Sequence, residues 1–589
     1  MTTPETVAGA TGLLRVFNAA EVLEFADVHT AQRICALGGE PDERVALAVA
    51  VTVRALRGGS VCVDLGAVAA DVGGPELPWP EPAGWLAAVR ASRLVREPPV
   101  LHLTDDGLLY LDRYWREEAQ VCTDLLALSL HGAPAAAPDL DRLFPPGYEE
   151  QRAAAQIALS QPVTVLTGGP GTGKTTTVAR LLALLARQAS VSGRGGLRIG
   201  LAAPTGKAAA RLAEAVSVEV LRLDPVDRQR LSGLSASTLH RLLGSRPDSA
   251  TRFRHHRGNR LPHDVIVVDE TSMVSLTLMA RLLEAVRPDA RLILVGDPDQ
   301  LASVEAGAVL ADLVDGLSAR SDTRVAALRT AHRFGASIGA LAAAIRAGDA
   351  DAVLTLLAAG GEHLEWIDDE DPVARLRAVL VPHALRLREA ALLGAEAVAL
   401  ATLDEHRLLC AHRRGPHGVE HWNRQVQRWL TEETGDTHWS PWYAGRPLLV
   451  TANDYGLGVH NGDTGVTLVR PDGLRAVIAG ADRVLEFAPS RLADVDTMHA
   501  MTIHKSQGSQ AEDVTVLLPA DDSRLLSREL FYTAVTRAKR TVRVVGSEAA
   551  VRAALGRRVV RASGLAQRLT AAPASQEPHQ PRDGTTNTV

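Results

Sequence analysis

The sequence predicts an α/β protein with two parallel-sheet domains, preceded by a mainly helical N-terminal domain. Apolar runs such as "DVIVVDE" (264–270) and "RLILVGD" (291–297) end in Gly, Asp or Glu shortly before helical segments. A second series follows later in the chain, including "DVTVLLP" (513–519) and "RTVRVVGS" (540–547). Such alternation is typical of parallel sheets whose ligands bind at the carboxyl ends of the strands.

The composition is that of a large globular protein without a basic excess. The chain has 589 residues, 46% of them hydrophobic, and a formal net charge of −6. At roughly 150 residues per domain, this length predicts about three or four domains. The charge excludes little, because a local basic patch is invisible in a whole-chain total. The four cysteines are scattered and form no CxxC pair, which argues against a disulfide framework or a zinc site.

No targeting or membrane segment is predicted. The N-terminus lacks a basic start followed by an apolar core. The longest apolar run, "VALAVAVTV" (45–53), is too short to cross a bilayer and is expected to be a buried helix or strand. We therefore expect a cytoplasmic protein without a membrane partner.

The first 140 residues are expected to form the N-terminal domain. Helical patterns predominate there, with short strands such as "SVCVDL" (60–65), and no chemical motif is recognisable. The Pro/Ala-rich stretch "GAPAAAPDLDRLFPPG" (132–147) is punctuated like a linker to the next domain.

The rest of the chain divides into two α/β units, an insert and a tail. The insert has short strands separated by Asn-Asp, Asn-Gly and Asp-Gly turns, which predicts a small antiparallel β-barrel. The tail is polar and contains proline, so disorder is expected. The expected bounds are 148–335 for the first unit, 336–439 and 496–565 for the two parts of the second, 440–495 for the insert and 570–589 for the tail.

The stretch "GGPGTGKTTT" (168–177) predicts a phosphate-binding loop, because it follows a strand and opens a helix. Its glycines let successive backbone N–H groups and the helix N-terminus face phosphates. Lys174 would reach the β- and γ-phosphates, and Thr175 would place its hydroxyl on Mg²⁺. A Gly-rich turn without a ligand is the alternative. The candidate nucleotide-binding residues of this loop are Gly168, Gly169, Pro170, Gly171, Thr172, Gly173, Lys174, Thr175 and Thr176.

An acidic pair ends a later apolar strand. Asp269 suits a direct or water-mediated Mg²⁺ contact, and Glu270 can orient or deprotonate an attacking water. Alone, such a pair is often only a helix cap. Together with the phosphate loop, it predicts hydrolysis of a nucleoside triphosphate.

Two further strand-to-helix turns carry polar residues. Gln300, in "GDPDQLASVEAG" (296–307), can contact both a γ-phosphate and a water and so sense hydrolysis. "APTGKAAARL" (203–212) offers Thr205, the Gly206 amide and Lys207, either for contact with a nucleic-acid strand or as an ordinary helix N-terminus.

The second unit is expected to complete the site across an interface. "HAMTIHKSQGSQ" (499–510) crowds hydrogen-bond donors onto one short turn. Arg333 and Arg537 lie in motif-like blocks and are candidates for stabilising charge on a transferring phosphoryl group. The arrangement predicts a motor with ATP between the two units.

These blocks resemble the motifs of superfamily 1 helicases, in the order found in that superfamily. Their details are similar to the RecD family, the α subunits of exodeoxyribonuclease V. The stretches that carry the resemblance are "GGPGTGKTTT", "APTGKAAARL", "STLHRLLG", "VVDETSM", "GDPDQLASVEAG", "HRFG", "LLCAHRRGPHGVEHWN", "WYAGRPLLVTANDYGLGVHNGDTG", "TIHKSQGS" and "YTAVTRAK".

The resemblance implies an ATP-dependent 5′→3′ translocase and helicase on single-stranded DNA. It implies a RecBCD helicase-nuclease acting at double-stranded DNA ends in recombinational repair, with RecB and RecC as partners and ATP and Mg²⁺ as cofactors. It further implies two RecA-like motor domains, an SH3-like barrel and a partner-docking N-terminal domain. The sequence shows no cluster of acids and lysine typical of a nuclease, so DNA cleavage is expected from a partner.

The resemblance also assigns residues. Gln151 matches an adenine-reading glutamine, and Gln507 and Gly508 are expected beside the nucleotide. The implied catalytic set is Lys174, Glu270, Gln300, Arg333 and Arg537, with Thr175 and Asp269 at the metal. The implied DNA-binding set is Thr205, Gly206, Lys207, Thr238, His240, Asn453, Asn461, Thr502 and His504.

One position departs from the family pattern. Gln510 stands where glutamate is usual, which puts a contact from that acid to the nucleotide ribose in doubt. Two other interpretations stay open: a free-standing RecD-like helicase, and a scaffold subunit whose motor has decayed. Aromatic residues make up only 4% of the chain, so phosphate contacts are expected to dominate DNA binding.

Overall fold

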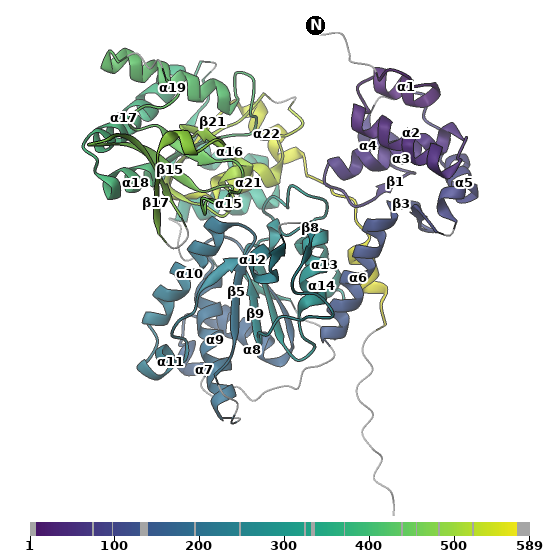
Figure 1. The fold of residues 1–589 in the computed structure, drawn as a ribbon, viewed down its shortest axis with the longest axis horizontal. Coiled ribbons are helices and arrows are strands. Elements are labelled where there is room, and N and C mark those ends of the chain that lie inside the picture. Colours follow the sequence, from purple (N-terminus) through teal and green to yellow (C-terminus); the bar gives the residue numbers. More distant parts are fainter. Residues whose placement is uncertain are drawn as a thin grey trace, which may run out of the picture.

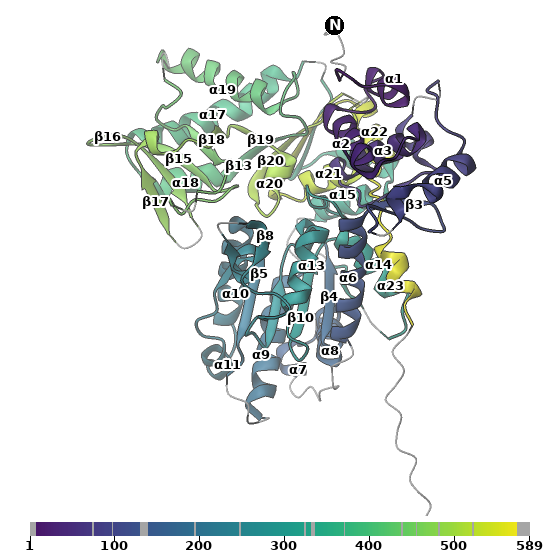
Figure 2. The ribbon, with the colours of Figure 1, turned by 45° about the vertical axis from the view of Figure 1, so that its right-hand side comes forward.

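The computed structural model describes residues 7–573 apart from short gaps. The gaps are 74–75, 97, 130–139, 192, 194–195, 247–248, 323–324, 331–335, 370, 437–439, 455, 481–482 and 521–522. Figures 1 and 2 show two α/β units, one above the other, with the N-terminal helices to one side. No helix in the described part of the chain is long and apolar enough to cross a bilayer.

The N-terminal residues form helices beside a small antiparallel sheet of order β1-β3-β2. The apolar run predicted to be buried forms α3, whose first turn is capped when Arg44 N–H donates to the Asp42 side chain. Trp85 is buried and its indole N–H donates to the Arg44 carbonyl over 2.7 Å. The elements are α1 (Gly12–Ala19), α2 (Phe25–Gly38), α3 (Glu43–Arg57), β1 (Val63–Asp64), α4 (Val68–Val72), α5 (Pro82–Ala91), β2 (Leu101–Leu103), β3 (Leu108–Leu111) and α6 (Asp112–Ser129).

The first α/β unit is built on a six-stranded parallel sheet of order β11-β4-β10-β9-β5-β6. Strand β9 shows why its sequence is continuously apolar: Val265 and Val267 pack on one face, and Ile266 and Val268 on the other. Its elements are α7 (Leu140–Leu143), α8 (Glu149–Ser160), β4 (Val163–Gly168), α9 (Lys174–Val191), β5 (Ile199–Ala203), α10 (Gly206–Leu221), α11 (Pro225–Arg230), β6 (Ala236–Thr238), α12 (Leu239–Leu243), the β7–β8 hairpin (Ser245–Arg246 and Ser249–Phe253), β9 (Val265–Val268), α13 (Leu276–Ala285), β10 (Arg291–Gly296), α14 (Val309–Ser318) and β11 (Ala326–Leu328).

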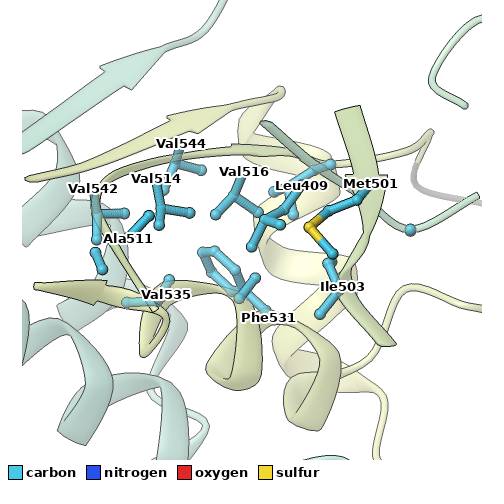
Figure 3. Close-up of a cluster of buried hydrophobic side chains, with 14 of the residues drawn as sticks. Leu409, Met501, Ile503, Ala511, Val514, Val516, Phe531, Val535, Val542 and Val544 are labelled. Carbon is cyan, nitrogen blue, oxygen red and sulfur yellow. The ribbon is translucent and has the colours of Figure 1, made fainter. Parts of the chain in front are cut away.

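The second α/β unit has a five-stranded parallel sheet of order β12-β21-β20-β13-β19. Figure 3 shows one face of this sheet, where Phe531 from α21 lies against Val514 and Val516 of β20. Its elements are α15 (Ala336–Ala347), α16 (Ala350–Ala359), β12 (Leu364–Ile367), α17 (Val373–Leu392), α18 (Glu396–Glu405), β13 (His406–Cys410), α19 (Val419–Thr434), β19 (Ala500–Thr502), α20 (Ile503–Ser506), β20 (Ala511–Leu517), α21 (Arg528–Val535), β21 (Ala538–Val545) and α22 (Glu548–Gly556).

The insert in the second unit is a five-stranded antiparallel sheet of order β17-β16-β15-β14-β18. Leu448, Ile478 and Phe487 contribute to a small core of its own. Its strands are β14 (Pro447–Val450), β15 (Thr464–Arg470), β16 (Gly473–Ala479), β17 (Val484–Phe487) and β18 (Val495–Thr497).

The C-terminal segment differs from the expected start of the tail at residue 570. Helix α23 (Leu565–Ala571) includes residues 570 and 571, because Leu565 and Leu569 are buried against the first unit. It packs on α14 and α6, so the chain leaves the second unit and returns to the first (Figure 1). The expected disorder of the tail concerns residues that, from 574 onward, lie outside the described part of the chain.

Candidate active site

The predicted phosphate loop connects β4 to α9. Gly171 and Gly173 have φ of 79° and 86°, a left-handed conformation that glycine adopts without strain. Helix α9 begins at Lys174, so its N-terminal N–H groups face the loop. The Lys174 ammonium donates to the carbonyls of Gly168 and Gly169 over 2.5 and 2.9 Å. The loop is thus already wrapped around the position of its lysine.

A cleft opens over this loop and is lined by both α/β units. Lys174 and Glu270 come from the first unit, and Gln510 and Arg537 come from the second. The lining residues are Pro170, Gly171, Gly173, Lys174, Thr175, Thr176, Ala208, Arg211, Leu212, Ala215, Asp269, Glu270, Gln300, Gly508, Gln510 and Arg537.

The acidic pair lies at the end of β9. The pKa of Asp269 is raised to about 6, chiefly by burial and also by the neighbouring Glu270, while Lys174 opposes the shift. Glu270 has φ of 50°, a strained conformation for a residue with a side chain. The two carboxyl groups therefore share a site that favours an additional cation.

Gln300 belongs to a hydrogen-bond network between the units. Its amide donates to the Asp297 carboxylate over 3.1 Å, and the Tyr532 hydroxyl donates to the same oxygen over 3.0 Å. Burial raises the pKa of Asp297, whereas Lys174 and both of these donors lower it. Asp297 thus connects the Gln300 amide to α21 of the second unit.

Arg537 is 2% exposed and follows α21. Its guanidinium donates to the carbonyl of Thr533 over 3.1 Å. Burial lowers its pKa, while the nearby Glu270 raises it. The second unit therefore directs a buried cation toward the acidic pair.

A second cleft, of about 400 Å³, is also shared by the two units. Neighbouring residues divide between the clefts, since Lys207 and Gln507 line the second while Ala208 and Gly508 line the first. The lining residues are Pro204, Thr205, Lys207, His240, Met273, Ser275, Leu278, Ser303, Val304, Glu305, Asn461, Gly462, Thr502, His504, Lys505 and Gln507.

The N-termini of helices α10 and α20 lie at this second cleft. Thr205 caps α10 by accepting from the Ala208 N–H, and Thr502 caps α20 by accepting from the Lys505 N–H. The pKa of Lys207 is lowered to about 8, chiefly by burial and also by Arg407. Burial also lowers the pKa of His504.

Gln507 was expected beside the nucleotide, but the structure places it in the second cleft. Its amide donates to the Leu301 carbonyl over 2.8 Å. The reason is local: α20 has only four residues, and the chain turns at Gln507 toward the first unit. Gly508 lines the first cleft.

Other expected residues are in neither lining. Gln151 is buried and its amide donates to the Thr172 carbonyl over 3.2 Å. Thr238 caps α12, and Asn453 accepts a hydrogen bond from the Asn461 N–H. The set outside both linings is Gln151, Gly168, Gly169, Thr172, Gly206, Thr238 and Asn453. Arg333 lies outside the described residues.

Sequence reasoning missed three residues of the first site. Arg211 lines the cleft from α10, and Asp297 and Tyr532 join the units. Arg211 lies in "APTGKAAARL" and Asp297 in "GDPDQLASVEAG", so their position after parallel strands was an available signal. Tyr532 begins "YTAVTRAK", but nothing local reveals its partner, which is 235 residues away.

The fold and these two clefts define an ATP-dependent DNA helicase of the phosphate-loop class. Residues 151–306 match the family model described as an AAA domain, and residues 497–545 match the UvrD-like helicase C-terminal domain. Residues 19–105 match the N-terminal domain of RecBCD enzyme subunit RecD.

Relatives identify the family. The chain is 74% identical to RecBCD enzyme subunit RecD of Mycobacterium tuberculosis over 560 residues, which is 95% of this chain and 97% of the relative. It is 70% identical to the same subunit of Mycolicibacterium smegmatis, covering 95% and 99%. The chain belongs to the RecD subunit family of the RecBCD enzyme.

Other matches are more distant. The ATP-dependent RecD2 DNA helicase of Deinococcus radiodurans is 33% identical and covers 80% of this chain, which spans 59% of that relative. Among solved structures, a Bacteroides Pif1 helicase in complex with ADP-AlF3 and single-stranded DNA is 16% identical, with a TM-score of 0.38, covering 67% of this chain and 91% of that chain.

Proposed function

We propose that the first cleft binds and hydrolyses ATP with Mg²⁺ and that the second holds a single DNA strand, so that turnover drives translocation in the 5′→3′ direction. The observation that carries this proposal is that both α/β units line both clefts. Gln507 and Gly508 are adjacent in sequence but line different clefts. A change in the nucleotide can therefore alter the grip on DNA through one short turn.

The residues of the first cleft have separate roles in hydrolysis. Lys174 holds the β- and γ-phosphates. In this structure its ammonium donates instead to the Gly168 and Gly169 carbonyls of the loop. Glu270 orients and deprotonates the attacking water. Gln300 senses the γ-phosphate, and Arg537 stabilises the charge that develops on the transferring group. Arg333 is proposed for the same charge-stabilising role from the family resemblance.

Mg²⁺ fits the acidic pair. Within the described part of the chain, no group of three or more His, Cys, Asp or Glu side chains is placed to hold a metal ion. A nucleotide-bound Mg²⁺ needs no such group, because phosphates and waters supply most of its ligands. The half-buried Asp269, with its raised pKa, and the Thr175 hydroxyl are the groups that would hold it. When bound, the ion would neutralise charge on the phosphates.

The second cleft suits a DNA backbone. Thr205 and Thr502 place helix N-termini at the cleft, and backbone N–H groups there bind phosphates well. Lys207, Lys505 and His504 add positive or donor groups. Asn461 completes the cleft from the antiparallel insert.

The finer domain assignments follow the resemblance. We take the two parallel-sheet units as RecA-like motor domains, the antiparallel insert as an SH3-like barrel and the N-terminal helices as a partner-docking domain. The curated relatives are named as RecBCD subunits. On that basis RecB and RecC are the proposed partners, double-stranded DNA ends the substrate, recombinational repair the process and the cytoplasm the location.

Replacing Lys174 with Gln tests the motor. Loss of the ammonium removes the charge that holds the phosphates, so DNA-stimulated ATP hydrolysis should fall by about 100-fold or more. Steady-state phosphate release with and without single-stranded DNA measures this. Lys539→Gln is the matched control, since Lys539 is an exposed lysine on β21 paired with Glu512. Hydrolysis that survived Lys174→Gln would favour the scaffold interpretation.

Unwinding assays test the direction of translocation. The purified chain should unwind substrates with a 5′ overhang and not those with a 3′ overhang, and the opposite preference would overturn the proposed direction.

Co-purification with two larger subunits separates a RecBCD subunit from a free-standing helicase. The match of residues 19–105 to the RecD N-terminal domain favours the subunit.

A further inference from the structure

A third groove lies outside both clefts, along helix α19 of the second unit. It encloses about 990 Å³. Helix α19 covers one face of the parallel sheet, opposite the face covered by α21 in Figure 3. The lining residues are His421, Arg424, Gln427, Arg428, Thr431, Glu432, Ser440, Pro441, Tyr443 and Thr497.

The open side of α19 carries more basic than acidic groups: Glu432 also lines the groove, but it is paired with Arg377 over 2.8 Å. His421, Arg424 and Arg428 are three and four residues apart and so share one face of the helix. Both arginines are exposed, and within the described residues no acidic side chain forms an ion pair with either. Arg428 donates to the amide oxygen of Gln425. Burial lowers the pKa of His421, and the two arginines lower it further.

The opposite side of α19 fixes the orientation of this basic face. Trp422, Val426 and Trp429 are buried in the core beneath the helix. The groove wall is also fixed, because the Asn423 amide donates to the Thr497 carbonyl over 2.8 Å. The cations are thus presented by a rigid surface.

The groove and the second cleft are linked by one short segment, because Thr497 lines the groove and Thr502 lines the cleft. Lys505 lines that cleft and its ammonium donates to Asn461 over 2.6 Å. Arg413 follows β13 and Lys505 follows β19, and these parallel strands pair Cys410 with Thr502, so the two segments begin side by side. Burial is the larger cause of the lowered pKa of Lys505, and the charge of Arg413 also lowers it. The same arginine is 3.7 Å from Asp496, which precedes Thr497 in the groove wall. Arg413 therefore stands between the two basic surfaces.

We propose that the DNA strand that leaves the second cleft at Lys505 passes Arg413 and enters the α19 groove, where Arg424 and Arg428 bind its phosphates. This inference rests on the proposed function. Phosphates are the ligand that Arg424 and Arg428 suit, and among the described lining residues no Phe, Tyr or Trp ring is exposed for stacking, since Tyr443 is buried. Binding there is therefore independent of sequence.

An acidic face of a partner protein is the alternative ligand for the same arginines. The continuity from Lys505 through Arg413 favours DNA, because a protein partner would not require the groove to join the second cleft. One measurement distinguishes the two ligands. Only if DNA occupies the groove should loss of the two arginines weaken the binding of long strands more than that of short ones.

The test compares short and long oligothymidylates on the full chain. A strand of about 8 nucleotides occupies the second cleft only, whereas one of about 30 also reaches the groove. Arg424→Gln with Arg428→Gln should weaken binding of the long strand by about tenfold and leave the short strand unaffected. The salt dependence for the long strand should become shallower by about 0.7 per lost phosphate contact. Fluorescence anisotropy at several salt concentrations measures both.

Two further variants sharpen the result. Arg15→Gln with Arg33→Gln removes the same charge from exposed positions on α1 and α2 and should change neither affinity. Arg413→Gln should reproduce the length-selective loss, since Arg413 lies on the route.

Three outcomes would overturn the inference. Equal binding of both lengths by the Arg424/Arg428 variant and the unmodified chain would show that DNA does not reach the groove. Equal loss for both lengths would place the arginines at the second cleft. Loss of co-purification with the larger subunits, with DNA binding intact, would make the groove a protein-docking site. If the unmodified chain bound neither strand, the proposed function itself would fail, and that result is distinct from the other three.

Discussion

Glu270 combines an unfavourable backbone conformation with a position in the first cleft. Within the described residues, only Glu21 and Glu270 are non-glycine residues with positive φ. At Glu270 the next residue helps to hold this conformation, because the Thr271 hydroxyl donates to the Val268 carbonyl over 2.9 Å. Such strain costs about 1 to 3 kcal/mol and is retained where the surrounding structure enforces it. It supports a role for the carboxylate in the reaction.

Glu270→Gln is predicted to block hydrolysis without blocking nucleotide binding. The amide has nearly the same shape but cannot accept a proton, so DNA-stimulated turnover should fall by about 100-fold or more. Phosphate release measures turnover, and a fluorescent nucleotide measures binding. Glu362→Gln, an exposed acid before β12, is the control. Turnover close to that of the unmodified chain would remove Glu270 from the mechanism.

Helix α23 packs on α14 and α6, far from both clefts, and buried charged residues at this contact influence the stability of the fold. Glu118 on α6 is fully buried and accepts from the Ser563 hydroxyl, the Gly564 N–H and the Arg568 guanidinium. Burial raises the pKa of the nearby Asp312 to about 7, with Glu118 adding to the shift and Ser563 opposing it. One oxygen of Asp312 is buried without a hydrogen-bond partner.

Asp312→Asn is predicted to stabilise the chain more at pH 8 than at pH 5. The unfolded carboxyl has a pKa of about 3.9, so between about pH 4 and 7 the folded state binds a proton that the unfolded state does not. Stability conferred by neutral Asp312 is therefore lost as pH rises through that window. The gain from Asn should be ~2 to 3 kcal/mol larger at pH 8 than at pH 5.

Calorimetric melting at the two pH values measures this difference. Asp71→Asn on the exposed surface of α4 is the control and should show no such pH dependence. A gain that was equal at both pH values would mean that Asp312 is ionised throughout.

At the scale of the whole molecule, the two α/β units meet at residues 297–301, just after β10. The Tyr532 hydroxyl donates to Asp297 over 3.0 Å, the Leu301 N–H donates to the Thr533 hydroxyl over 2.9 Å, and Gln507 donates to the Leu301 carbonyl over 2.8 Å. These bonds link the sensor segment to α21 and to the second cleft.

Tyr532→Phe is predicted to weaken this junction. The buried Asp297 carboxylate loses one of its donors, at a cost of about 1 to 3 kcal/mol. Stimulation of ATP hydrolysis by DNA should fall several-fold, because the sensor amide loses its connection to the second unit. Phosphate release with and without DNA measures the ratio. Tyr114→Phe on α6 is the control, and equal stimulation in both variants would separate Asp297 from the coupling.

The parallel sheets and the phosphate loop were predictable because their signals are local. Val265–Val268 is continuously apolar since both of its faces are covered, and Lys174 and Asp269 follow strands directly. The bounds of the C-terminal tail were not predictable in the same way. Helix α23 exists because Leu565 and Leu569 find a surface on α14 and α6, which a local pattern does not reveal.

The sequence by itself determined that this chain carries a phosphate loop, an acidic pair and the ordered motifs of a helicase, because each is a short run beside a strand or a helix. The tertiary structure alone decided that Gln507 lines the second cleft, that Tyr532 reaches Asp297 and that Arg413 stands between Lys505 and the α19 groove. Those placements depend on how two sheets pack against each other, and residues more than 200 positions apart meet only when that packing is complete.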